Sequence, residues 1–352
     1  MRMSESSPSI IFRCDCSPRI GMGHVVRCRV FATALRDRGV AVAFVMTGQL
    51  DQESGFVVEP APGCGFEGGL LQPEDAGALI SAARRHGAPA VLVDHYGADE
   101  QYLSALKKSG LRVAVIDDIG DRNLLAADWL LNQNISANRF EYHVRPDCEM
   151  LMGPRYALLR PQFREARARL NRLFSVEDRR VLVTFGGGDV TRFVIRTLQA
   201  LGNCPVRLEV RCLAGAGYGD AELRRAAAES PHKVELFGMT RDIAPHMTWA
   251  DLSINAGGIS SWEFCCLGVP MLVVTLSSNQ QANAEGLTAA GIARRLPPPD
   301  GAQFHSAVAS SVLNLLMGPD ERQRMSDAGC NLVDGGGADR AAASFYEFFG
   351  KR

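Results

Sequence analysis

Short apolar runs alternate with longer amphipathic segments along most of this chain, and the alternation starts a second time after a charged stretch near the middle. A short apolar run fits a strand that is buried on both faces of a sheet, and an amphipathic segment fits a helix that covers one of those faces. Strands that alternate with helices are typical of parallel sheets. The sequence therefore predicts an α/β fold made of two doubly wound halves.

The first half, residues 1–163, is expected to form an N-terminal α/β domain. After His24, the residues Val26, Val30 and Leu35 fall on one helical face, and Gly39 can end that helix. Further helices are expected near residues 76–86 and 99–109. The expected strands are SIIFRCD, VAVAFVMTG, AVLVDHYG, RVAVIDD and WLLNQN.

The charged stretch REARARLNRLFSVEDRR interrupts this rhythm, and it predicts a connecting helix over residues 164–180. Residues 181–352 then form a second Rossmann-like domain, with strands RVLVTFGGG, VRLEVRCLAG, KVELFGM, DLSINAGG and MLVVTL. Two doubly wound domains that face each other leave a cleft at the carboxyl ends of their strands, which is where ligands bind in such folds. We expect the substrate in that cleft.

Composition excludes several classes of function. The chain has 38 basic and 39 acidic residues, scattered to a net charge of -1, which does not favour a nucleic acid or an anionic membrane as partner. The start, MRMSESSPS, lacks the apolar core of a signal peptide, and no apolar stretch is long enough to span a bilayer. We therefore expect a cytoplasmic protein without stable membrane insertion.

The ten cysteines mostly lie inside apolar segments, which favours buried thiols over disulfides. Their spacing lacks the paired cysteines and histidines of a structural zinc site. We expect neither a metal nor a cofactor.

Each half opens with a strand, a glycine loop and a helix. Glycines in such a loop let backbone N–H groups approach an anion at the helix N-terminus. A dinucleotide site is disfavoured because Val26 occupies the third glycine position of the G-x-G-x-x-G motif. The strand VAVAFVMTG also lacks the terminal acid that would hold a ribose. Predicted substrate-binding glycines in these loops are Gly21, Gly23, Gly187 and Gly188.

The segment NAGGISSWE predicts a pyrophosphate and ribose site. Gly257 and Gly258 end a strand, Ser260 or Ser261 can cap the helix that follows, and Glu263 falls in its first turn. Backbone amides and a hydroxyl suit a pyrophosphate, and a carboxylate suits the ribose diol. An ordinary N-cap with a dipole-matching acid fits the segment equally well. The next strand ends near Asn279 and Gln280, whose amides we place at the same site.

Several motifs occur in the order and spacing of a known family: IFRCDCSPRIGMGHVVR, VDHYG, LLNQN, GPRYALLRPQF, FGGGD, NAGGISSWE and the pair Asn279-Gln280. Over about residues 10–290, the chain resembles the UDP-2,4-diacetamido-2,4,6-trideoxy-β-L-altropyranose hydrolases of the pseudaminic acid pathway. That resemblance implies the GT-B fold of inverting glycosyltransferases. It also implies metal-independent hydrolysis between the sugar C1 and UDP, with His24 as the catalytic histidine and with Arg13 and Asn132 among the substrate-binding residues.

The residues around His24 fit that chemistry. His24 follows the glycine loop at the start of a helix, where the dipole favours a neutral imidazole that can take a proton from water. Asp15 ends the preceding strand and is expected to orient either His24 or the sugar. Asp94, His95 and Tyr96 end another strand and are expected to line the sugar, and His95 could replace His24 as base.

Hydrolysis of a UDP-linked deoxyamino sugar is therefore the predicted function, with inversion at C1. UDP leaves as a stable anion, so a single base suffices where ordinary glycosidases need two carboxyl groups. The alternatives are an inverting glycosyltransferase with the same donor, and a non-catalytic module that binds nucleotide sugars. The expected partner is a UDP-sugar.

Overall fold

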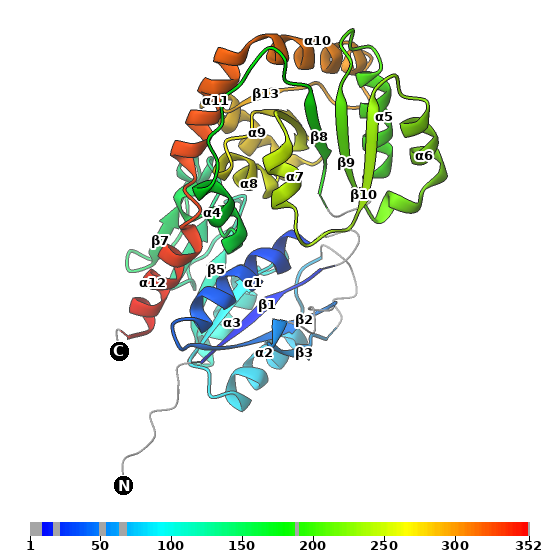
Figure 1. Ribbon diagram of the computed structural model, residues 1–352. Helices are drawn as coiled ribbons and strands as arrows, with labels where there is room; N and C mark the ends of the chain where they lie inside the picture. The colour runs from blue at the N-terminus through cyan, green and yellow to red at the C-terminus, as the bar shows by residue number, and fades with distance from the viewer. Residues whose placement is uncertain (1–8, 17–21, 49–53, 63–68, 187–189, 351–352) are drawn as a thin grey trace. The chain divides into compact units, whose positions relative to one another are not determined.

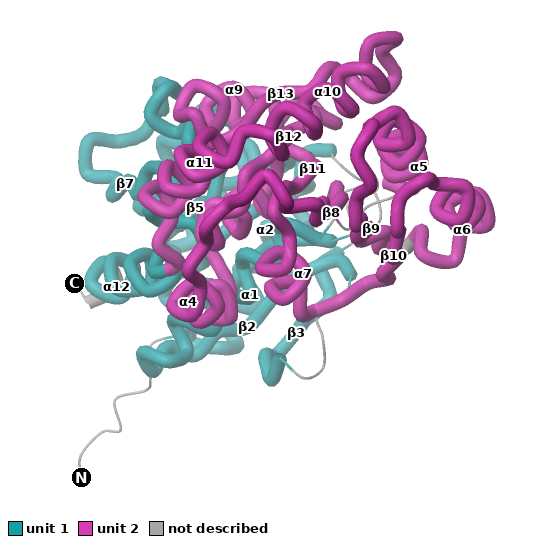
Figure 2. The backbone as a smooth tube through the Cα atoms, turned by 45° about the horizontal axis from the view of Figure 1, so that its top comes forward, with its two compact units in different colours: residues 1–158, 336–352 teal, residues 159–335 magenta. Residues whose placement is uncertain are grey.

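The computed structural model describes residues 9–16, 22–48, 54–62, 69–186 and 190–350. The chain divides into two compact units (Figure 2): unit 1 contains residues 1–158 and 336–352, and unit 2 contains residues 159–335. Each unit is built on one parallel sheet with helices packed against it (Figure 1). The predicted α/β class with two doubly wound sheets is therefore confirmed.

The sheet of unit 1 has the strand order β3-β2-β1-β4-β5-β6-β7, and all of its described pairs are parallel. This order changes direction between β1 and β4, and in open α/β sheets ligands bind at the carboxyl ends of the strands at such a point. The strands are β1 (Ser9–Cys14), β2 (Ala41–Met46), β3 (Val57–Pro60), β4 (Ala90–Asp94), β5 (Arg112–Ile116), β6 (Trp129–Asn132) and β7 (Glu149–Met152).

Alternate side chains of β1 enter two separate apolar cores. Ile10 and Phe12 pack in the core that contains α1 (Gly23–Arg36) and α12 (Gly337–Gly350). Ile11 packs in the core that contains α2 (Pro73–Arg85) and α3 (Glu100–Lys108). A strand covered by helices on both faces buries every residue, which explains its continuous apolar run. The short 3₁₀ helices of this unit are η2 (Ala137–Arg139) and η3 (Pro154–Tyr156).

The sheet of unit 2 has the order β10-β9-β8-β11-β12-β13, and its described pairs are again all parallel. Its strand order changes direction between β8 and β11. The strands are β8 (Arg180–Thr184), β9 (Glu209–Gly215), β10 (Lys233–Gly238), β11 (Leu252–Ala256), β12 (Met271–Val274) and β13 (Ala293–Arg295).

Helices of unit 2 connect and cover these strands, and α5 and α10 share the main apolar core with β8, β9, β11 and β12. The α helices are α4 (Pro161–Ala168), α5 (Thr191–Leu201), α6 (Ala221–Ala228), α7 (Ala244–Trp249), α8 (Ser260–Cys266), α9 (Gln281–Ala289), α10 (Phe304–Met317) and α11 (Pro319–Leu332). The 3₁₀ helices are η4 (Ala216–Gly219) and η5 (Ser278–Gln280). Within the described ranges, no helix combines the length and apolarity that a membrane span requires.

The predicted connecting helix over residues 164–180 is wrong for most of its length. Helix α4 begins earlier, at Pro161, and ends at Ala168, and irregular backbone continues to Arg179. Arginines in this stretch act as hydrogen-bond donors to helix ends. Arg167 donates to the carbonyl oxygens of Cys266, Cys330 and Val333 at 3.0 Å. The charged stretch that was expected to form a connecting helix therefore has a capping role.

The last helix also differs from the expected division, which assigned residues 181–352 to the second domain. Helix α12 belongs to unit 1, where the Phe345 ring packs edge-on against Trp129 at 5.1 Å and against Phe31 at 5.6 Å. These three side chains are fully buried. The sequence of α12 shows that one face of the helix is apolar, but it does not show which of the two sheets that face covers. The predicted cleft between the halves stays a prediction.

Candidate active site

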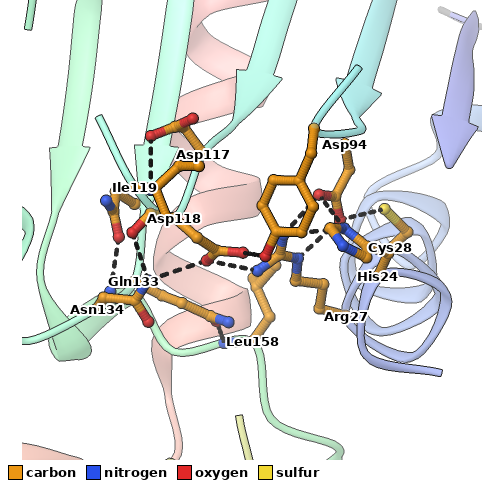
Figure 3. Close-up of polar contacts among 12 residues, drawn as sticks. His24, Arg27, Cys28, Asp94, Asp117, Asp118, Ile119, Gln133, Asn134 and Leu158 are labelled. Atoms are coloured by element: carbon orange, nitrogen blue, oxygen red, sulfur yellow. Dashed lines mark hydrogen bonds and ion pairs between the residues drawn. The ribbon is translucent and has the colours of Figure 1, made fainter. Parts of the chain in front are cut away.

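His24 and Asp94 meet at the point where the strand order of unit 1 changes direction. His24 is the second residue of α1, which follows β1, and Asp94 is the last residue of β4. The parallel register places Asp94 beside Cys14, the last residue of β1. His24 Nδ1 lies 2.7 Å from Asp94 Oδ1 (Figure 3). The sequence marked both residues as site candidates but did not predict that they pair.

Arg27 holds the Asp94 carboxylate from the next turn of α1. Its Nε donates to Asp94 Oδ2 at 2.7 Å and its Nη2 to Asp94 Oδ1 at 2.5 Å, while its Nη1 donates to Asp118 Oδ1 at 2.8 Å. Burial alone would raise the pKa of Asp94, but the charge of Arg27 and the hydrogen bonds from Arg27 and His24 outweigh it and hold that pKa below its usual range. Asp94 is therefore a carboxylate at neutral pH.

The charge of Asp94 determines which nitrogen of His24 is available. A carboxylate only accepts hydrogen bonds, so Nδ1 carries the proton and Nε2 carries the lone pair. Arg27 Nη2 also lies 3.2 Å from Nδ1, and an arginine can only donate, so this contact would need a lone pair on Nδ1. The shorter contact of Nδ1 is with Asp94, which only accepts, so we place the proton on Nδ1. Among the described residues, Nε2 has no hydrogen-bond partner, and the His24 side chain is 9% exposed. This arrangement leaves Nε2 as the nitrogen that can take up a proton.

Tyr96 borders the imidazole through its ring. The two ring centroids lie 4.8 Å apart, edge to face. The Tyr96 hydroxyl donates to Asp118 Oδ2 at 2.9 Å. Asn134 Nδ2 donates to Asp118 Oδ1 at 3.0 Å (Figure 3). Asp118 thus fixes both Tyr96 and Arg27. Arg27 and Asp118 were not predicted as site residues, although Arg27 is one helical turn from His24 and Asp118 ends the segment RVAVIDD.

Asp15 belongs to a second polar cluster rather than to the His24 pair. It accepts hydrogen bonds from Arg13 Nη2 at 3.0 Å and from the backbone N–H of Thr47 at 2.7 Å, and it lies 3.2 Å from His95 Nε2. Burial acts to raise the pKa of Asp15, but His95 and Arg13 lower it overall. The carboxylate that contacts His24 is Asp94, so the expectation that Asp15 orients the base does not fit this geometry.

Arg13 and His95 are also occupied within that cluster. Arg13 is fully buried, and its Nε and Nη2 donate to Asp75 at 3.0 Å and 2.8 Å. His95 Nδ1 accepts from the backbone N–H of Gly97 at 2.9 Å, so its Nε2 carries the proton that faces Asp15. In this geometry His95 lacks the free lone pair of a substitute base. Arg13 pairs with Asp15 and Asp75, and its predicted contact with substrate stays a prediction.

Asn132 also makes buried hydrogen bonds. It is fully buried at the end of β6, where its Nδ2 donates to the Tyr142 hydroxyl at 2.7 Å and its Oδ1 accepts from the backbone N–H of Asn134 at 2.9 Å. Its expected contact with substrate stays a prediction. Gly23 is the first residue of α1, directly before His24. Gly21, Gly187 and Gly188 lie outside the described residues.

In unit 2, the loop after β11 and the segment after β12 lie against each other, as the sequence suggested. A methyl group added to Gly257 would lie 3.2 Å from the Gln280 carbonyl oxygen, and one on Gly258 would lie 3.8 Å from Gln280 Nε2. Gln280 Oε1 accepts from the backbone N–H of Leu276 at 2.9 Å. Asn279 is exposed beside it. A side chain would therefore be tightly placed at Gly257, whereas Gly258 has ordinary clearance from Gln280.

The predicted serine cap of α8 is wrong. Ile259 already has helical backbone angles, so Ser260 is the first helical residue and neither serine caps the helix with its side chain. Ser261 is instead buried, with its hydroxyl 3.4 Å from the Ala256 carbonyl oxygen. Glu263 lies in the first turn as expected. Its Oε1 accepts from Arg160 Nη2 at 3.1 Å.

Titratable groups elsewhere bear on the predicted absence of a metal site. In the described part of the chain, no group of three or more histidine, cysteine, aspartate or glutamate side chains is arranged to hold a metal ion. The cysteines that the structure describes are free thiols, and most are buried. The buried-thiol interpretation therefore agrees with the structure for these residues.

This chain is similar to proteins that, by their names, act in polysaccharide and nucleotide-sugar metabolism. Residues 181–334 match the Glycosyltransferase family 28 C-terminal domain. The spore coat polysaccharide biosynthesis protein SpsG of Bacillus subtilis is 26% identical over 337 residues, which cover 94% of this chain and 95% of the relative. A UDP-2,4-diacetamido-2,4,6-trideoxy-β-L-altropyranose hydrolase of Campylobacter jejuni is 25% identical over 288 residues, which cover 80% of this chain and 97% of the relative.

The solved structure of MurG from Acinetobacter baumannii aligns with a TM-score of 0.72 at 17% identity, covering 97% of this chain and 99% of MurG. This chain has the GT-B fold. These similarities support the broader prediction of a GT-B nucleotide-sugar enzyme. The particular reaction of this GT-B protein is a proposal.

Proposed function

We propose that this GT-B protein hydrolyses the bond between C1 of a sugar and UDP, with His24 as the general base. One observation carries the proposal: ionised Asp94 holds Nδ1–H of His24, and Nε2 has no partner among the described residues. A general base needs a lone pair within reach of the proton that it removes. A water at Nε2 would lose its proton as it attacks C1.

The chemistry needs only one base. Alcohol leaving groups in ordinary glycosides require an acid, but UDP departs as a stable anion. Attack from the face opposite UDP inverts the configuration at C1. The loop with Gly257 and Gly258 offers backbone amides to the pyrophosphate, and the Glu263 carboxylate offers acceptors to the ribose hydroxyls. No metal or other cofactor takes part in this proposal.

The proposed substrate is a UDP-linked 2,4-diacetamido-2,4,6-trideoxy sugar. Support comes from the Campylobacter jejuni relative, whose name specifies hydrolysis of such a compound and which is matched over nearly its whole length. The product would enter pseudaminic acid synthesis in the cytoplasm, for the modification of flagellin or another surface glycan. Asn279 is exposed beside Gln280, and its side-chain amide would add polar contacts to this substrate.

An inverting glycosyltransferase is the second candidate. Similarity to the family 28 C-terminal domain and to the MurG structure favours it. The same His24–Asp94 pair would then deprotonate an acceptor hydroxyl instead of water. The two candidates differ in whether turnover needs an acceptor.

The test is incubation of the purified protein with the UDP-linked diacetamido sugar in the absence of any acceptor. We expect release of UDP together with free sugar, and ¹H NMR at early times should show the inverted anomer. Activity should persist in EDTA. UDP binding without UDP release from a panel of UDP-sugars would contradict hydrolysis, and release that appears only with an added acceptor would support the transferase.

A further inference from the structure

The motif GPRYALLRPQF has no role in the proposed chemistry, although its Arg160 makes two contacts at the carboxyl edge of the unit 2 sheet. Arg160 directly precedes α4. Its Nη2 donates to Glu263 Oε1 at 3.1 Å. Its Nη1 donates to the carbonyl oxygen of Arg241 at 2.6 Å, in the loop that connects β10 to α7. One guanidinium therefore links α8 to a neighbouring loop at the same edge.

We infer that Arg160 is a positioning residue of the nucleotide site, which holds the Glu263 carboxylate ionised and oriented while it fixes the loop after β10. This inference rests on the proposed role of Glu263 as the ribose acceptor. The planar fork of an arginine suits such a double contact, because each nitrogen donates in a set direction. A lysine could supply the charge but not both bonds.

The surroundings of Glu263 explain why it needs a cation. Glu263 is 7% exposed, and this burial raises its pKa to about 6, with Arg160 acting in the opposite direction. Without Arg160, the pKa of Glu263 would rise further towards neutral pH. A protonated carboxyl has lost much of its capacity to accept hydrogen bonds from a diol. Arg160 thus sets the pH range in which the site can hold a ribose.

Other charged groups near α8 are directed elsewhere. Arg167 of α4 donates to the Cys266 carbonyl oxygen at the opposite end of α8, and Arg172 donates to the Leu267 carbonyl oxygen. Arg160 is the charged group that moves the pKa of Glu263 in the described structure. Helix α8 packs against α4, α11 and β11. The other titratable or charged side chains on these four elements are Arg164, Glu165, Cys265, Cys266, Asp320, Glu321, Arg322, Arg324, Asp327 and Cys330.

The experiment is a calorimetric titration with UDP-N-acetylglucosamine between pH 5 and pH 8. This probe has no terminal phosphate monoester, whose own second pKa near 6 would obscure the result. For the unmodified protein we expect constant affinity above about pH 7 and a decline as the pH falls through about 6, where Glu263 takes up a proton. Arg160→Gln should shift that midpoint upward by about one pH unit. At pH 6.5 its affinity should fall about threefold, because the ionised fraction of Glu263 falls by that factor.

Arg160→Lys separates charge from geometry. It should keep the midpoint near that of the unmodified protein, because a cation remains, but it should bind several-fold more weakly at every pH. Glu263→Gln should remove the pH dependence. The matched control is Arg164→Gln, which removes an exposed cation one turn along α4 and should change neither midpoint nor affinity. Melting temperatures would show that each variant is folded.

An unchanged midpoint in folded Arg160→Gln would overturn the inference and leave Arg160 a structural residue. If the unmodified protein does not bind the probe, both the inference and the proposed nucleotide site fail. If it binds the probe but releases UDP from no UDP-sugar, only the hydrolase proposal fails, and the titrations still decide the role of Arg160.

Discussion

A histidine becomes a directed base when a neighbour fixes one of its nitrogens and leaves the other free. Asp94 does this for His24, and Arg27 keeps Asp94 ionised and in place through two hydrogen bonds. A neutral residue at position 94 would stabilise neither the correct tautomer nor the imidazolium that forms when water is deprotonated.

Asp94→Asn should therefore lower kcat by roughly 10² to 10⁴ while the KM for the UDP-sugar changes little. The amide keeps the shape of the carboxylate but removes its charge. Steady-state kinetics with circular dichroism as a folding check would measure this. A kcat within threefold of the unmodified enzyme would show that Asp94 does not act through His24.

For Glu263, the charged form that the proposed ribose contact needs is also the form that lowers the stability of the fold. Its folded pKa of about 6 lies above the ordinary value of 4.5, so its favourable contribution to stability is complete below pH 4.5 and is lost as pH rises through about 6. At pH 7.5 the charged form costs about 2 kcal/mol.

Glu263→Gln should thus raise the free energy of unfolding at pH 7.5 by up to about 2 kcal/mol. It should also weaken UDP binding by about 1.5 to 3 kcal/mol, because the ribose loses a charged acceptor. Urea denaturation and calorimetry would measure the two effects. Loss of stability with unchanged affinity would make Glu263 a structural partner of Arg160.

At the scale of elements, arginines of the stretch around α4 donate hydrogen bonds to the carbonyl oxygens at the ends of short helices in unit 2. Arg172 donates to the carbonyl oxygens of Met247, Ala250 and Leu267, at 3.0, 2.7 and 2.6 Å. These oxygens lie at the carboxyl ends of α7 and α8, where the helix dipole favours a cation. Burial lowers the pKa of Arg172 to about 10, so it remains charged at neutral pH.

Arg172→Met should cost about 2 to 3 kcal/mol of stability, because several carbonyl oxygens lose their donor together. Arg169→Met is the matched control, since Arg169 is exposed at the end of α4 and its loss should have little effect. Thermal unfolding of both variants would decide this. Equal melting temperatures for the two would mean that water replaces the Arg172 hydrogen bonds.

At the scale of the whole molecule, the succession of strands and helices along the chain could be predicted, because hydrophobic periodicity depends only on residues close in sequence. The pairing of His24 with Asp94 could not, since the two residues are 70 positions apart and the register of β1 with β4 brings them together. The engagement of Arg13 with Asp75 was hidden for the same reason, being set by the packing of α2 against β1. Nor did periodicity reveal that α12 returns to unit 1.

The central claim is that His24 is the base of an acceptor-free hydrolysis, and kinetics of His24→Asn tests it most directly. The variant keeps some hydrogen-bonding capacity at the start of α1 but has no basic nitrogen. With the UDP-linked diacetamido sugar as substrate, we predict a fall in kcat of roughly 10² to 10⁴ and an unchanged Kd for UDP. A near-normal kcat with a raised KM would contradict the claim and make His24 a residue that positions the sugar.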